Sequence, residues 1–160
     1  MTSAYIKTLE TLIILGLVAM VSLTLSSTLI RLIPGQGGIY WAEEVSRYIS
    51  IWVVFLAGGL GIRYWIHLNV DIFVIMLPGR AQNWLMIFCL GLMLLFEGVL
   101  LWFGGTLTIS NHAQQSASLQ MPMSYAYAAI PVGAVIMIGE TLRLIWREYT
   151  SQPREFFEAD

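Results

Sequence analysis

The chain has 160 residues, of which 58% are hydrophobic and 11% charged, and its formal net charge is −2. Soluble domains carry about 25% charged residues, so this composition argues against a soluble domain and favours a bilayer as the solvent. The slightly acidic balance gives no electrostatic basis for binding nucleic acid, and we expect membrane lipid instead.

Four apolar segments are long enough to cross a membrane as helices, which need about 20 apolar residues each. They run from about Glu10 to Leu32, Ala42 to Tyr64, Gln82 to Ile109 and Met123 to Trp146. Strands are excluded as single crossings, because an open sheet edge in lipid leaves backbone groups unpaired. We therefore predict an all-α integral membrane protein: one membrane domain over residues 1–160, with four transmembrane helices in a small bundle and a solvated tail over 150–160.

The first segment is expected to remain as a crossing and not to be cleaved as a signal peptide. Its apolar stretch, Leu12 to Ile30, is longer than the usual 7–15 residues, and no small-residue cleavage site follows it. Orientation follows from Lys and Arg near the segment ends. With a cytoplasmic N-terminus, only Arg31 and Arg47 fall near the outer face, so we expect both termini in the cytoplasm.

The second segment opens with three charges in the stretch WAEEVSRYISIW, residues 41–52. On a helix, Glu43, Glu44 and Arg47 can share one face, with Arg47 in reach of either acid. One interpretation is a first turn whose acids complement the helix dipole. The other is a polar contact face for another helix, and Trp52 in the same stretch is a further interface candidate.

The connection from Arg63 to Arg80 alternates apolar and polar residues, including His67 and Asp71. Alternation is typical of a strand, but a lone strand at a membrane surface has no partner. We predict a short interfacial segment on the cytoplasmic side, with Arg63, His67 and Asp71 as candidates for contact with a partner.

Glu97 lies near the middle of the third crossing, where a carboxylate costs on the order of 2.5–3.5 kcal/mol on insertion scales. We expect a structural ion pair with Arg47 or Arg31. A proton or ion relay and a contact with another subunit are the alternatives. Glu140 is expected to pair locally with Arg143, three residues later.

Pro131 falls inside the fourth crossing, where we predict a kink. Motifs for chemistry are missing: the two histidines, His67 and His112, fall on opposite sides of the predicted membrane, and there is no Gly-x-Ser-x-Gly elbow or phosphate-binding loop. We therefore predict no enzyme activity, no catalytic residue, no metal and no cofactor.

Three stretches together resemble a known family. They are Trp41-Ala-Glu-Glu-Val-Ser-Arg-Tyr48, the run Gly58–Asp71 with Arg63 and His67-Leu-Asn-Val-Asp71, and Ser118-Leu-Gln-Met-Pro122 followed by Tyr127-Ala-Ala-Ile-Pro-Val-Gly133. Their order and spacing resemble the small, DctQ-like membrane subunit of tripartite ATP-independent periplasmic (TRAP) transporters.

The resemblance implies a location in the bacterial inner membrane beside a large multi-spanning subunit that holds the transport path. It further implies a periplasmic substrate-binding protein as partner and uptake of an organic acid, such as a dicarboxylate or sialic acid, driven by an ion gradient, usually sodium. The small subunit would brace the scaffold of the large one and help dock the binding protein. The alternatives are a stand-alone four-helix channel or assembly factor, and the small subunit of a tripartite tricarboxylate transporter.

Overall fold

The computed structural model describes residues 2–33, 39–64 and 79–150. Its helices are α1 (Thr2–Arg31), α2 (Tyr40–Arg63), α4 (Gly79–Ser110), α5 (Ser124–Tyr127) and α6 (Ala129–Thr150). Four helical stretches are long and apolar enough to cross a membrane, and they are Ala4–Arg31, Tyr40–Arg63, Trp84–Ser110 and Ser124–Trp146. The predicted all-α fold with four spanning helices is thus confirmed.

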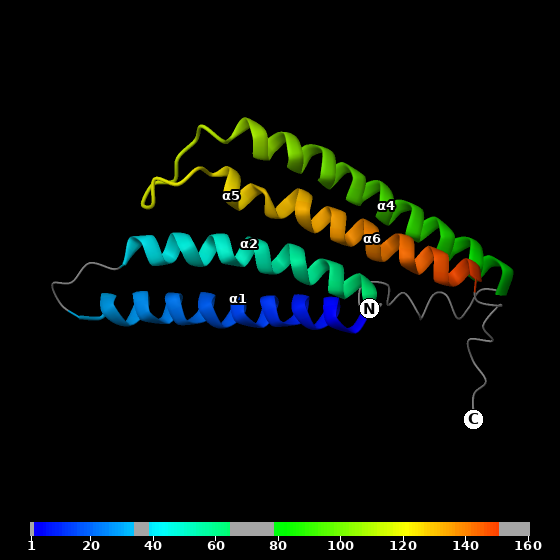
Figure 1. The fold of residues 1–160 in the computed structure, drawn as a ribbon, viewed down its shortest axis with the longest axis horizontal. Helices are drawn as coiled ribbons and strands as arrows, with labels where there is room; N and C mark the ends of the chain where they lie inside the picture. Colours follow the sequence, from blue (N-terminus) through cyan, green and yellow to red (C-terminus); the bar gives the residue numbers. More distant parts are fainter. Residues whose placement is uncertain (1, 34–38, 65–78, 151–160) are drawn as a thin grey trace, which may run out of the picture.

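The long helices lie side by side in a single row, in the order α4, α6, α2, α1 (Figure 1). Helices α6 and α2 occupy the middle of the row, and α4 and α1 form its two edges. The expected small bundle is therefore wrong in one respect, because the row does not close on itself. Both edge helices keep large apolar side chains exposed, among them Leu15, Val18, Phe88 and Phe96. In a bilayer these side chains meet lipid or another protein.

The first and third of the long helices begin earlier than expected by three residues or more, and α2 begins at Tyr40, two residues before Ala42. The first starts at Thr2 and not near Glu10, and the third starts at Gly79 and not near Gln82. In the first helix, the hydroxyls of Thr8 and Thr11 donate to carbonyl oxygens four residues back, at 2.9 and 2.7 Å, so these polar residues do not end the helix. The predicted interfacial segment with His67 and Asp71 lies outside the described residues.

Glycines allow the close approach of neighbouring helices at each contact in the row. A Cβ atom added at Gly16 would lie 2.5 Å from a Val53 methyl group, which joins α1 to α2. An added Cβ at Gly59 or Gly104 would lie equally close to a side chain of α6. These distances are far below van der Waals contact, so a larger residue at these positions would have to displace the neighbouring side chain.

Candidate functional site: polar anchors at the two ends of the helix row

A short hairpin over residues 114–123 connects α4 to α5. The Ser116 N–H donates to the Met121 carbonyl at 2.9 Å, and the Met123 N–H donates to the Gln114 carbonyl at 2.8 Å. Gln120 takes a left-handed backbone conformation with φ of 55°, which the tight reversal requires. We call the end of the row that carries this segment the hairpin end.

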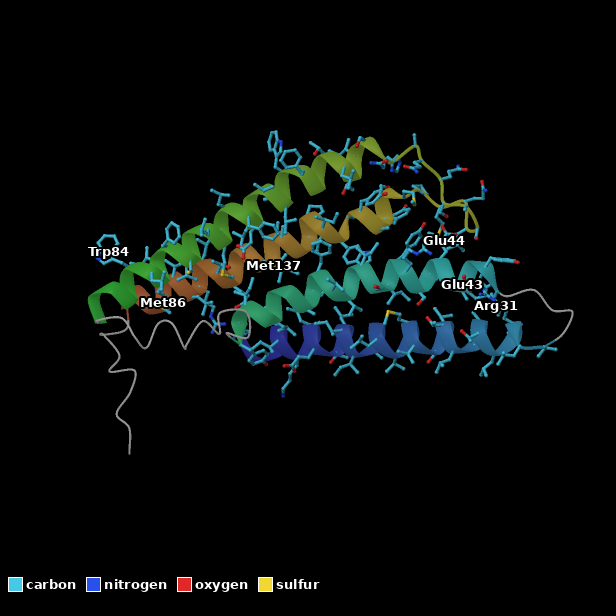
Figure 2. The ribbon with its side chains drawn as sticks, turned by 180° about the vertical axis from the view of Figure 1, so that it is seen from behind. Arg31, Glu43, Glu44, Trp84, Met86 and Met137 are labelled. Atoms are coloured by element: carbon cyan, nitrogen blue, oxygen red, sulfur yellow. The ribbon has the colours of Figure 1, made fainter. Side chains whose placement is uncertain are left out.

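Glu44 fastens the hairpin to α2. Its Oε2 accepts the backbone N–H groups of Ser118 at 2.9 Å and Leu119 at 3.2 Å. Its Oε1 accepts the Tyr48 hydroxyl at 2.7 Å. Figure 2 shows Glu44 on the side of α2 that faces the hairpin. Because hydrogen bonds to a carboxylate are stronger than neutral ones, this single side chain fixes where the hairpin sits.

Glu43, the preceding residue, serves a different neighbour. It forms an ion pair with Arg31 at the end of α1, and it accepts the Ser27 hydroxyl at 3.3 Å. Figure 2 shows Glu43 and Arg31 between α2 and α1. Successive residues on a helix point about 100° apart, so the two acids bind opposite neighbours in the row. The expectation that both acids share one contact face is therefore wrong.

Arg47 is exposed and lines a groove between α1 and α2. Within the part of the chain that the structure describes, it forms no hydrogen bond or ion pair. The predicted pairing of Arg47 with an acid one turn earlier is therefore wrong, because Glu43 and Glu44 have other donors.

Trp52 lies deeper on α2, and its indole N–H donates to the Tyr125 carbonyl of α5 at 3.0 Å. Helices α5 and α6 are separated at Ala128, three residues before Pro131. Proline has no N–H for the carbonyl four residues earlier, so an interruption is expected near this place, and Pro131 itself sits in the first turn of α6. His112 Nδ1 lies 3.0 Å from the Ser124 hydroxyl and ties the start of the 111–123 connection to α5.

At the opposite end of the row, Arg63 of α2 binds Glu140 of α6. Its Nη1 lies 2.9 and 3.2 Å from the two carboxylate oxygens, and both side chains are nearly buried, at 11% and 8% exposed. The predicted Glu140–Arg143 contact is present but longer, at 3.5 Å. We call this end of the row the terminal end.

The terminal end also joins α1 to α2. The Tyr64 hydroxyl donates to Glu10 Oε1 at 2.7 Å. The hydrogen bond to this carboxylate holds the pKa of Tyr64 above its ordinary value of about 10, because loss of the phenol proton would break the bond. This contact was not expected from the sequence, where the two residues are far apart.

Glu97 is buried between α4 and α6, at 2% exposed. Its Oε1 accepts the hydroxyl of Thr141, which is fully buried, at 2.7 Å, and its Oε2 has no partner among the described residues. The expected ion pair with Arg47 or Arg31 is wrong, because those side chains lie at the α1–α2 side of the row. The residue therefore makes a polar contact between two helices.

Across the described ranges, no cluster of three His, Cys, Asp or Glu side chains is suited to hold a metal ion. The polar groups instead join helices: Glu44 and Trp52 connect α2 to the hairpin and α5, Arg63 connects α2 to α6, and Thr141 connects α6 to α4. In the described part of the chain, these polar side chains therefore connect neighbouring helices.

A family model described as the DctQ component of tripartite ATP-independent periplasmic transporters matches residues 13–151. The chain belongs to this family. The resemblance read from the three sequence stretches is thus confirmed, and members of the DctQ family are transporter components and not enzymes.

Two relatives place this DctQ-family chain among TRAP permeases. It is 27% identical over 108 residues to the C4-dicarboxylate TRAP transporter small permease protein DctQ of Rhodobacter capsulatus. The matched region covers 66% of the chain and 48% of that relative. It is 30% identical over 138 residues to the isethionate TRAP transporter permease protein DctMQ of Oleidesulfovibrio alaskensis. That matched region covers 82% of the chain and 22% of the relative. The chain thus spans under half the length of either relative.

Proposed function

We propose that the chain is the small permease subunit of a TRAP transporter and braces the scaffold of a large transport subunit. The observation that carries this proposal is the single open row of helices (Figure 1). The described helices of this row do not close around a path for a solute, whereas their apolar faces and edges offer a wide surface to another membrane protein. Bracing also suits the polar anchors, which hold the row rigid at both ends.

The proposed partner is a large multi-spanning membrane subunit. Support comes from the DctMQ permease of O. alaskensis, in which the matched region is 22% of the length. Most of that permease lies outside the matched region, so we infer that a chain of this length works beside a much larger one.

We further propose that the protein lies in the bacterial inner membrane with its hairpin end in the periplasm and both termini in the cytoplasm. Basic residues near the spans support this orientation. Lys7, Arg63 and Arg143 belong to the terminal end, while Arg31 and Arg47 belong to the hairpin end. From the sequence, the same orientation puts three more basic residues on the cytoplasmic side, namely Arg80, Arg147 and Arg154. The hairpin that Glu44 holds would then help dock a periplasmic substrate-binding protein.

The transported substrate is proposed to be an organic acid, such as a dicarboxylate or sialic acid, taken up with an ion gradient, most commonly of sodium. The two relatives named for C4-dicarboxylate and isethionate transport support an organic anion. Selection among such anions would belong to the partner subunits.

Reconstitution in liposomes tests the proposal. We expect organic-acid uptake with the large subunit, the binding protein and this chain together, and no ion flux from this chain alone. A mild-detergent purification of the tagged chain should recover one large membrane protein that is homologous to the remaining part of the DctMQ permease.

The alternative of a stand-alone channel predicts the opposite result. Ion flux through liposomes that contain only this chain, changed by Glu97→Gln, would refute the subunit proposal. Recovery of the chain alone as a monodisperse species would also count against it. An Arg143→Gln variant serves as a control, since its guanidinium is about half exposed and pairs with Glu140 near the end of α6.

A further inference from the structure

A groove of about 430 Å³ lies between α1 and α2 on the hairpin half of the row. Its α1 wall is mostly apolar and its α2 wall is polar, and the main lining residues are Met20, Val21 and Leu25 of α1 and Ser46, Arg47 and Ser50 of α2. One side of the groove thus suits a hydrocarbon chain, and the other carries a cation.

Most polar groups in the groove already have partners. The Thr24 and Ser46 hydroxyls lie 2.8 Å apart, and Ser46 also donates to the Met20 carbonyl at 3.3 Å. Glu43 is held by Arg31. Because Arg31 and Glu43 compensate each other, the Arg47 guanidinium is left as the charged group of the groove for which the described residues supply no counter-ion.

The depth of Arg47 fits the headgroup region of a bilayer. Tyr40 and Trp41 at the start of α2 are 68% and 51% exposed, and exposed aromatic residues at a span end mark the membrane interface. Arg47 follows Trp41 by six residues, or about 9 Å at 1.5 Å per residue. From that depth a long basic side chain snorkels toward the lipid phosphates while its stem covers apolar surface.

We propose that this groove binds one anionic phospholipid, with the headgroup phosphate on the Arg47 guanidinium and an acyl chain along Met20 and Val21. The planar fork of an arginine matches two phosphate oxygens at once. The single uncompensated charge favours a headgroup of net charge −1, such as phosphatidylglycerol, over a zwitterionic one. This inference does not depend on the proposed transporter assignment, because the groove is built from this chain alone.

Native mass spectrometry of the full chain in mild detergent, with any partner that accompanies it, tests the proposal. Phosphatidylglycerol and phosphatidylcholine of equal chain length are titrated in turn. One basic residue near the membrane surface is worth about 1 kcal/mol toward an anionic lipid, so we expect phosphatidylglycerol to bind about fivefold more tightly. Arg47→Gln should abolish this preference, and Arg47→Lys should retain most of it.

Two further variants separate the headgroup from the chain. Val21→Trp fills part of the groove on its apolar side without changing any charge. It should therefore weaken the binding of both lipids to the same extent and keep the preference for phosphatidylglycerol. Arg143→Gln removes a guanidinium at the terminal end, far from the groove, and should leave the preference between the two lipids unchanged. Soluble glycerol phosphate, which has the phosphate but no acyl chain, should not displace the lipid.

Three outcomes overturn the proposal. In the first, the unaltered chain shows no preference between the two lipids, or Arg47→Gln keeps the preference. In the second, glycerol phosphate competes as well as the lipid, which indicates a free-anion site. In the third, Arg47→Gln leaves lipid affinity unchanged but releases a membrane protein partner, which assigns Arg47 to a protein contact.

Discussion

Gly133 on α6 faces α2 so closely that replacing it by alanine must move the two helices apart. A Cβ atom at this position would lie 2.6 Å from Phe55 Cβ and 3.1 Å from the Phe55 carbonyl oxygen. Neither atom moves when a side chain changes rotamer, because both are fixed by the α2 backbone. Since carbon atoms prefer a separation of about 3.5–4.0 Å, relief requires a shift of about 1 Å along the central interface.

The cost of that shift can be compared with a control on the same helix. Overpacking with a backbone shift costs about 1–3 kcal/mol, and alanine recovers about 0.5–1 kcal/mol relative to glycine in a helix. We therefore expect Gly133→Ala to lower the free energy of unfolding by up to about 2.5 kcal/mol. Gly139, six residues later on the same helix, has no neighbouring atom within 4 Å of an added Cβ, so Gly139→Ala should be neutral or stabilising.

The assay is reversible unfolding of the full chain in mixed micelles, in which sodium dodecyl sulfate is titrated and helix content is followed by circular dichroism. Both variants are measured against the unaltered chain. If Gly133→Ala unfolds at the same point as Gly139→Ala, then the close α2–α6 contact does not limit packing, and the reasoning fails.

The remaining predictions concern the polar contacts. Arg63→Met should lower the free energy of unfolding by about 2–3 kcal/mol in the same titration, because it removes the nearest cation from the nearly buried Glu140 carboxylate. Arg143→Met removes the more distant and more exposed cation, so it should lower the free energy of unfolding clearly less. Equal effects of the two variants would contradict the assignment of Arg63 as the main partner of Glu140. Glu44→Gln should speed hydrogen exchange at the backbone N–H groups of Ser118 and Leu119, because these groups donate to the Glu44 carboxylate. Exchange is measured by mass spectrometry, and Glu43→Gln should leave the exchange rate of both groups unchanged. Thr141→Val keeps the side-chain shape but removes the donor to the mid-span acid, so it should cost about 1–2 kcal/mol, and an unchanged unfolding midpoint would refute that role.

The four crossings were predictable because hydrocarbon imposes a simple rule on every span. Each helix must be about 20 apolar residues long, and composition alone reveals such runs. Composition does not show where a helix begins, because a helix can extend through polar residues before the apolar run. Thr8 and Thr11 donate their hydroxyls to carbonyl oxygens of the same helix, so they do not interrupt it. The packing order was not predictable, since lipid-facing and protein-facing side chains are equally apolar in a membrane helix.

The contacts of the candidate residues could be inferred only where the partners are near in sequence. The Glu140–Arg143 pair, one helical turn apart, was predicted and is present. The Arg63–Glu140 and Glu44–Ser118 contacts join residues more than seventy positions apart, and the local spacing gives no signal for them. Local spacing gave the wrong partner for Arg47, because Glu43, one turn away on the same helix, pairs with Arg31 of α1 instead.

Depth in the membrane explains why the two buried acids on the α4–α6–α2 side have different partners. Glu140 lies near the end of its span, where a nearly buried carboxylate keeps Arg63 and Arg143 as counter-ions whose charged heads stay close to water. Glu97 lies near mid-span, where burying the charge of an arginine beside it would carry a large desolvation cost. A hydroxyl donor such as Thr141 carries no such cost and still fixes the register of α4 against α6. Among the described residues, the acid therefore connects the edge helix of the row to α6 through a hydroxyl and without a cation.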